Sequence, residues 1–288
     1  MAKALAYGLG VDFIEQDVVA TRDRELVVLH DIYLDDVSDV AARFPGRARD
    51  DGRYYVVDFT LAELGELRLV ERRRPGEPGP RFPGRFPYAS PEFRVLRFED
   101  EIRLIAGLNA TTGGQVGIYP EIKDTGWHEQ SGIDLTRLVH AALERARDDL
   151  ISGRVFVQSF DAGALQRLAG ELGSSWPRVQ LLGPDEVATL GDDRGVLAAI
   201  ADYASGVGLP YTALIERRAG GLRPTRLAGK LTEAGLLVHP YTLRRDGEAP
   251  EGIDYFAALR FLILELRVDA IFCDQPDDAL AVRDGSAA

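Results

Sequence analysis

The sequence predicts an α/β fold in which buried parallel strands alternate with amphipathic helices, as in a barrel of β/α units. Two observations predict this class. Short apolar runs rich in valine, isoleucine and leucine recur along the 288 residues, and a helical pattern follows most of them. A single domain over 1–288 is expected, because barrels of this kind commonly have this length.

Seven apolar runs have the length and composition of strands that are buried on both faces. These runs cover 11–19, 116–122, 155–160, 179–182, 204–209, 236–241 and 270–273. Helical patterns lie between them at 135–149, 162–172, 195–203, 226–234 and 255–266. This alternation predicts β/α crossovers that place the strands in one parallel sheet.

The run 25–30 differs from the others because it follows the preceding strand too closely. Only about five residues separate the two, whereas a parallel crossover needs about a dozen. We therefore expect a hairpin with its turn at Asp23 and Arg24, in which the numbers of facing residues sum to about 46 or 47. This register brings His30 back beside Asp17 and Asp31 beside Glu15.

Residues 43–110 interrupt the alternation of strands and helices. They contain a piece rich in proline, glycine and arginine, ERRRPGEPGPRFPGRFP, with weakly patterned flanks. A stretch of this length without the β/α pattern is unusual inside a compact domain. We expect it to be an insertion subdomain that packs over one end of the barrel.

The overall charge limits the classes of partner. A net charge of −12 and an isoelectric point of about 4.9 repel nucleic acids and anionic lipids, but they allow a small anionic substrate in a local cationic site. No apolar run approaches the roughly 18 residues of a membrane span, and nothing resembles a signal peptide. Cys273 is the only cysteine, which excludes an intrachain disulfide. The compartment and the oligomeric state stay open.

Acidic side chains mark the ends of two predicted strands. Glu15 and Asp17 are two residues apart, so both point to one side of their strand while Gln16 points away. Glu121 and Lys123, in YPEIK, repeat this spacing. Three carboxylates suit a hard divalent cation, Ca²⁺ or Mg²⁺, and Lys123 could supply a positive charge to a phosphate oxygen. The alternatives are solvated acids at a strand end and a Glu–Lys surface pair.

His30 is the catalytic candidate for proton transfer, and Lys123 is the catalytic candidate that supplies positive charge. Histidine titrates near neutral pH, and the hairpin sets His30 within reach of whatever the cation holds. The alternative is a purely structural hydrogen bond. His128 and His140 are assigned no role.

Further candidates stand where other predicted strands end, the position at which barrel enzymes build their sites. We expect these residues to contact substrate: Gln158, Phe160, His239, Tyr241 and Phe272. For His239 a structural role is an equal alternative.

The segments FIEQDVVATRDRELVVLHD, FPGRFP, GIYPEIK, QSFD, VHPYT and FCDQP, in this order, resemble the glycerophosphodiester phosphodiesterases over nearly the whole chain. The long stretch 43–110 makes the chain most similar to the bacterial periplasmic type. The resemblance implies a TIM barrel of the PLC-like phosphodiesterase type that hydrolyses glycerophosphodiesters to sn-glycerol 3-phosphate and an alcohol. It also implies Ca²⁺ or Mg²⁺ at Glu15, Asp17 and Glu121, and an acid–base role for His30.

The chain departs from the family pattern at its start. The family begins with a strand that ends in His-Arg-Gly, whereas 1–10 resembles only the tail of the helix that follows, so the first strand is expected to be absent. That strand would carry the second acid–base histidine and a phosphate-gripping arginine, and Asp36 stands where the family usually has an arginine. The departure implies impaired turnover for this chain, and an extracytoplasmic location if an upstream segment exists. The alternatives are a non-catalytic relative that binds a polyol phosphate, and metal-assisted enolisation of a sugar phosphate, which would leave His30 idle.

Overall fold

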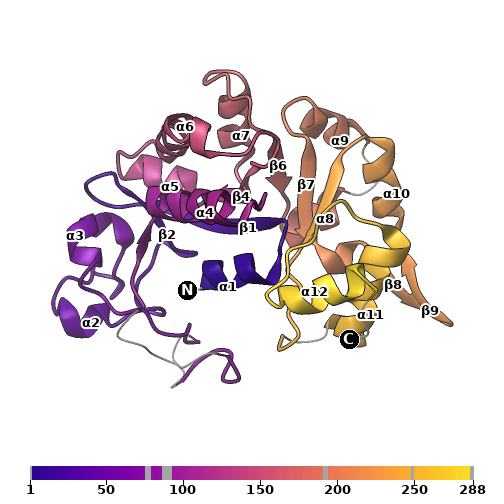
Figure 1. Cartoon of the computed structure of the whole chain (residues 1–288), viewed down its shortest axis with the longest axis horizontal. Helices are drawn as coiled ribbons and strands as arrows, with labels where there is room; N and C mark the ends of the chain where they lie inside the picture. Colours follow the sequence, from indigo (N-terminus) through magenta and orange to yellow (C-terminus); the bar gives the residue numbers. More distant parts are fainter. Residues whose placement is uncertain (1, 75–78, 86–92, 191–193, 248–249, 286–288) are drawn as a thin grey trace. The chain divides into compact units, whose positions relative to one another are not determined.

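The computed structural model describes residues 2–74, 79–85, 93–190, 194–247 and 250–285 (Figure 1). The chain divides into two compact units. The central unit is Glu15–Val155, and the terminal unit combines Met1–Ile14 with Phe156–Ala288. Within the described ranges, no helix combines the length and the apolar character needed to cross a membrane.

The strands of the central unit are β1 (Phe13–Ala20), β2 (Leu26–Val28), β3 (Leu96–Arg97) and β4 (Gly117–Ile122), in the order β4-β1-β2-β3. β2 returns antiparallel to β1, and β3 is antiparallel to β2. Val18 faces Val28 and Ala20 faces Leu26, so the numbers of facing residues sum to 46. The predicted hairpin and its register are confirmed.

Helices α4 (Phe98–Thr112) and α6 (Leu135–Arg145) pack against β4, as Figure 1 shows. On α6, Leu135, Val139 and Leu143 recur at every fourth position and are buried, which is the stripe expected of a helix that covers a sheet. α4 ends at Gly113, whose φ of 73° is the left-handed conformation that glycine adopts without strain. The remaining short helices of this unit are α2 (Val40–Arg43), η1 (Val56–Asp58), α3 (Leu61–Leu64), α5 (Thr125–Gln130) and η2 (Arg147–Asp149).

The stretch 43–110 contains fully buried apolar side chains. Phe59, Leu64, Leu67 and Phe98 have no exposed surface. Residues 75–78 and 86–92, which include the end of FPGRFP, lie outside the described ranges. The described part is therefore a packed structure and not an extended loop.

The terminal unit holds four parallel strands, β5 (Val157–Ser159), β6 (Arg178–Leu181), β7 (Gly206–Pro210) and β10 (Leu237–Tyr241), in the order β10-β7-β6-β5. Every one of them was predicted. The helices are α1 (Ala2–Leu9), α7 (Ala162–Ala169), α8 (Pro184–Leu190), α9 (Arg194–Ala201), α10 (Arg226–Glu233), α11 (Tyr255–Arg260) and α12 (Pro276–Arg283), with short turns η3 (Tyr211–Ala213), η4 (Pro250–Gly252) and η5 (Phe261–Leu266).

The predicted strand over 270–273 is wrong. This segment forms one isolated parallel bridge, between Leu243 and Cys273. Its hydrogen bonds to β10 are irregular: the N–H groups of Asp269 and Phe272 donate to the carbonyls of Val238 and Pro240. A proline has no N–H to return, so a regular ladder cannot form beside it.

The terminal unit also contains a hairpin that we did not predict, made of β8 (Ile215–Arg218) and β9 (Gly221–Pro224). Ala219 and Gly220 form its turn, and Gly220 and the first residue of β9, Gly221, have φ of 99° and 123°. These left-handed angles explain the glycine pair, because side chains with a Cβ rarely adopt them.

Candidate functional site

The structure brings the three predicted carboxylates together in the central unit. Ligand atoms of Glu15, Asp17 and Glu121 all lie within 4.8 Å of one another. Along β1 the even-numbered Gln16 is buried and its acidic neighbours are partly exposed, as strand alternation requires. The side-chain oxygen of Gln16 accepts a hydrogen bond from the N–H of Tyr119 at 3.1 Å, which ties β1 to β4. The three acidic side chains therefore face one point.

Lys123 lies against the same cluster. Its Nζ is 2.8 Å from Oε1 of Glu121 and 3.4 Å from Oδ1 of Asp17. Burial raises the pKa of Glu121 above its usual range, while the nearby ammonium opposes that rise. Burial also lowers the pKa of Lys123, but the surrounding carboxylates outweigh burial and raise it, so the ammonium stays charged.

The donor set fits a hard divalent cation. Every candidate ligand atom is a carboxylate oxygen, the type that Ca²⁺ and Mg²⁺ prefer. Burial makes the negative charge of Glu121 costly. A divalent cation held by Glu15, Asp17 and Glu121 would neutralise negative charge at this point.

His30 follows the end of the hairpin ladder. The last bond of the ladder runs from the N–H of Leu29 to the carbonyl of Asp17, at 2.9 Å. The imidazole is mostly exposed, and its Nδ1–H donates to Oδ1 of Asp31 at 2.5 Å. The charge of His30 acts on the pKa of Glu121, so the ring lies within electrostatic reach of the carboxylate cluster. With Nδ1 engaged, Nε2 is the nitrogen that can exchange a proton with a substrate.

Asp31 is held from two sides. Arg72 donates from Nη1 to Oδ2, the oxygen that His30 does not use. Burial opposes ionisation, but the hydrogen bonds from His30 and Arg72 outweigh it and hold the pKa of Asp31 well below its usual range. Asp31 is therefore a carboxylate at any pH where the protein would work.

His128, to which no role was assigned from the sequence, links the two strands that carry the carboxylates. It is fully buried on α5. Nε2 accepts from the N–H of Ala20 at 3.2 Å, and Nδ1–H therefore donates to the carbonyl of Asp124 at 2.9 Å. Burial lowers the pKa of His128, which favours this neutral form.

Asp124, whose carbonyl accepts from His128, has a left-handed backbone, with φ of 43°, at the turn from β4 into α5. The only sequence signal for a role of His128 was its position, five residues after Lys123.

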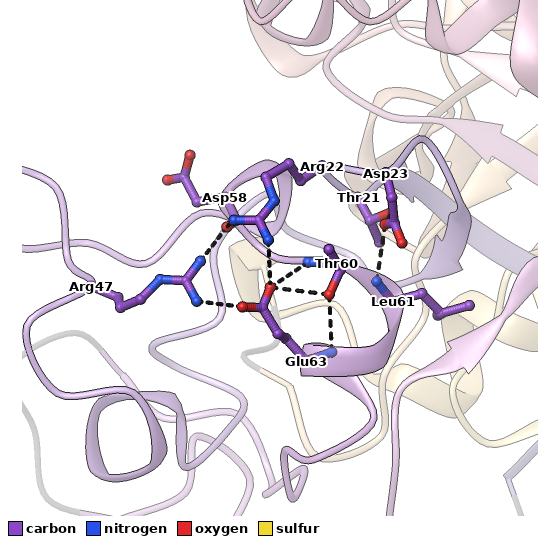
Figure 2. Close-up of polar contacts among 8 residues, drawn as sticks. All are labelled: Thr21, Arg22, Asp23, Arg47, Asp58, Thr60, Leu61 and Glu63. Atoms are coloured by element: carbon purple, nitrogen blue, oxygen red, sulfur yellow. Dashed lines mark hydrogen bonds and ion pairs between the residues drawn. The ribbon is translucent and has the colours of Figure 1, made fainter.

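The tip of the hairpin is bound to the start of α3, as Figure 2 shows. Oδ1 of Asp23 accepts from the hydroxyl of Thr21 at 2.6 Å and from the N–H of Leu61 at 3.0 Å. The N–H of Arg22 donates to the carbonyl of Phe59 at 2.8 Å. Residues from the 43–110 stretch thus hold the hairpin whose return strand leads to His30.

Glu63 is the centre of the remaining contacts in Figure 2. Thr60 and Glu63 form a reciprocal cap of α3, in which each side chain accepts from the backbone N–H of the other. Arg47 and Arg22 donate to the same carboxylate, at 2.7 and 3.2 Å. The N–H of Thr60, helped by Arg47, lowers the pKa of Glu63 to about 2. This network fixes α3 against the hairpin.

The residues predicted to contact substrate belong to the terminal unit. The exposed ring of Phe160 meets the ring of Tyr241 edge to face, with centroids 5.9 Å apart, where β5 and β10 end. The hydroxyl of Tyr241 donates to the carbonyl of Leu182 at 2.7 Å. Gln158 is buried on β5, and Phe272 is half-buried. The structure thus pairs Phe160 with Tyr241 at one end of the strands.

His239 is buried on β10. Its ring packs edge to face on Phe156, with centroids 5.4 Å apart. Burial lowers the pKa of His239 to about 4, so the imidazole is neutral near neutral pH.

Comparisons with known proteins identify similar sequences and structures. The model of the glycerophosphoryl diester phosphodiesterase family matches residues 1–278. A glycerophosphodiester phosphodiesterase of Haemophilus influenzae is 36% identical over 301 residues, covering 96% of this chain and 83% of the relative. One of Treponema pallidum is 35% identical over 270 residues, covering 85% and 76%.

Solved structures are similar at lower identity. A glycerophosphodiester phosphodiesterase from Agrobacterium tumefaciens superimposes with a TM-score of 0.59 at 22% identity, covering 96% of this chain and 90% of that one. An Oleispira antarctica phosphodiesterase in complex with the product sn-glycerol-3-phosphate gives a TM-score of 0.65 at 17% identity, covering 98% and 89%. At these identities the likeness shows the fold, which is the predicted TIM barrel.

Proposed function

The chain belongs to the glycerophosphoryl diester phosphodiesterase family, and we propose that it hydrolyses glycerophosphodiesters to sn-glycerol 3-phosphate and an alcohol at the carboxylate cluster. The single observation that carries this proposal is the meeting of Glu15, Asp17 and Glu121 within 4.8 Å beside the ammonium of Lys123. The Oleispira antarctica neighbour holds the expected product.

The family is metal-dependent, and the carboxylates of Glu15, Asp17 and Glu121 would hold the ion, Ca²⁺ or Mg²⁺. When bound, such an ion supplies charge neutralisation and Lewis acidity at the phosphoryl oxygens. The side chains of this chain supply the rest. Lys123, fixed by its ion pairs to Glu121 and Asp17, presents an ammonium for a non-bridging oxygen.

His30 moves a proton in this scheme. Hydrolysis of a phosphodiester requires a proton on the departing alcohol and removal of one from the attacking group. Asp31 fixes Nδ1 and thereby orients the ring, which leaves Nε2 for one of these two transfers. The stretch 43–110 acts as an insertion within a single barrel domain over 1–288, and it holds the hairpin that leads to His30.

Residues at the ends of the terminal-unit strands are also proposed to contact substrate. These residues are Gln158, Phe160, His239, Tyr241 and Phe272. Support comes from the ring pair of Phe160 and Tyr241 at the carboxyl ends of β5 and β10, the edge at which barrel enzymes bind substrate.

The test is release of sn-glycerol 3-phosphate from glycerophosphocholine, followed with a coupled glycerol-3-phosphate dehydrogenase assay. We expect release in Ca²⁺ or Mg²⁺, and loss of release both in excess chelator and in Asp17→Asn. Absence of product in either ion, from a folded protein, would contradict the proposal.

A further inference from the structure

An arginine from the 43–110 stretch completes a chain of contacts to His30. Oδ1 of Asp31 binds Nδ1 of His30 at 2.5 Å, and Oδ2 of the same carboxylate binds Nη1 of Arg72. The two oxygens are used separately, so both contacts exist at once. Asp31 therefore cannot turn toward one partner without releasing the other.

Backbone hydrogen bonds hold Arg72 in place. The N–H of Val70 donates to the carbonyl of Val37, and the N–H of Arg73 donates to the carbonyl of Asp36, each at 2.9 Å. These bonds align the segment around Arg72 antiparallel to the segment that follows Asp31. The side chains of Arg72 and Asp31 are 26% and 20% exposed, so solvent screens their pairing less than it screens a surface ion pair.

We propose that Arg72 is a positioning residue for His30 and acts through Asp31. This inference rests on the proposed function, in which His30 transfers a proton. Arg72 holds the Asp31 carboxylate in the orientation that fixes the imidazole ring, and it offsets part of the negative charge that the ring experiences. The other charged group shown to interact with His30 is Glu121 of the carboxylate cluster.

Removal of the Arg72 guanidinium and removal of the Asp31 charge should shift the titration of His30 in opposite directions. Removing the guanidinium leaves the carboxylate charge uncompensated, which favours the imidazolium and raises the pKa of His30. Removing the carboxylate charge favours the neutral ring and lowers it.

NMR titration tests this prediction without relying on turnover. The chain has only four histidines, so the imidazole signals can be assigned by substitution. We expect Arg72→Gln to raise the pKa of His30, Asp31→Asn to lower it, and Arg72→Lys to stay near the wild type. Arg43→Gln is the matched control, because Arg43 belongs to the same stretch and pairs with Glu66 on the surface, both side chains being more than half exposed.

Steady-state kinetics on glycerophosphocholine tests the positioning role. We expect Arg72→Gln to lower kcat by roughly 10- to 100-fold with a smaller change in KM, and Arg72→Lys to recover most of the loss. The limb of the pH–rate profile that reports His30 should move in the same direction as the NMR titration. Arg43→Gln should change neither quantity.

The outcomes separate this inference from the proposed function. An unchanged His30 titration in a folded Arg72→Gln protein, an equal change in Arg72→Lys and Arg72→Gln, or shifts of the same sign in Arg72→Gln and Asp31→Asn would overturn the inference. A wild-type protein without turnover would overturn the proposed function, while opposite NMR shifts would still establish the link from Arg72 to His30.

Discussion

At the scale of single residues, the main feature is the buried ion pair of Glu121 and Lys123 beside the carboxylates of Glu15 and Asp17. Glu121 and Lys123 are 7% and 9% exposed, so each depends on the other to stay ionised. Lys123 also contacts Asp17, the strand neighbour of Glu15. A divalent cation bound by Glu15, Asp17 and Glu121 would add positive charge to this group of carboxylates.

Replacing Lys123 with methionine tests its role in the chemistry. Loss of a preorganised cation at the phosphoryl oxygens should lower kcat/KM by about 100-fold or more at saturating metal. The matched control is Lys230→Met on α10 of the terminal unit, which should retain wild-type kinetics. Equal losses of kcat/KM in the two variants would show that the Lys123 ammonium has no specific role in catalysis.

His239 makes a prediction for stability as a function of pH. Its pKa is lowered to about 4 in the folded protein from 6.5, so between these pH values the unfolded chain binds a proton that the folded protein does not. Stability should therefore fall by on the order of 3 kcal/mol as the pH is lowered through this range, and be fully present above it.

Urea unfolding at a series of pH values measures this effect. The difference between the wild type and His239→Gln isolates the contribution of His239 from that of other groups. We expect the wild type to lose stability more steeply than the variant between pH 6.5 and 4. Parallel curves would show that His239 is not buried in its neutral form.

The residue spacings predicted part of this site and could not predict the rest. Spacing by two placed Glu15 with Asp17, because strand geometry is local. The partners of Arg72 and His128 lie 41 and 108 residues away, and no local pattern reports such contacts. The roles of Arg72 and His128 were therefore found only in the structure.

At the scale of secondary-structure elements, the position of β1 beside β4 decides the geometry of the carboxylates. The N–H of Lys123 donates to the carbonyl of Val18 at 3.2 Å, and His128 links Ala20 to Asp124. Loss of these bonds would let one strand slide against the other, and a small displacement is enough to separate ligands of one ion.

His128→Leu tests the link between the strands. The substitution leaves the N–H of Ala20 without its acceptor, which should cost about 1–3 kcal/mol of stability and weaken metal binding measured by calorimetry. His140→Leu on α6 is the matched control, because within the described residues Nδ1 of His140 has no hydrogen-bond partner. Equal effects of the two substitutions on metal affinity would contradict the proposed link.

Element prediction succeeded where local chemistry decides the structure. The short connection before 25–30 forced a hairpin, and its register followed from the position of the turn. The 270–273 prediction was wrong because Pro240 lies in the neighbouring strand and cannot donate, a condition that the apolar run itself does not show. The β8–β9 hairpin was missed although the pair Gly220 and Gly221 is a turn signal.

At the scale of the whole molecule, the order of strands and helices was readable from the sequence because each β/α unit repeats the same hydrophobic pattern. The stretch 43–110 was predicted to be an insertion because it lacks that pattern, and its contacts to the hairpin were not predicted. The net charge of −12 is unfavourable for an anionic substrate, so binding should depend on the local cations at the cluster.

The proposed hydrolysis depends on one cation shared by the side chains of Glu15, Asp17 and Glu121. A crystal structure of the protein grown in Ca²⁺, with anomalous scattering used to locate the ion, tests this directly. We expect one calcium peak with oxygens of all three carboxylates at about 2.3–2.6 Å. A protein that hydrolyses glycerophosphocholine in the same Ca²⁺ buffer but shows no ion at these carboxylates, or shows it elsewhere, would contradict the account.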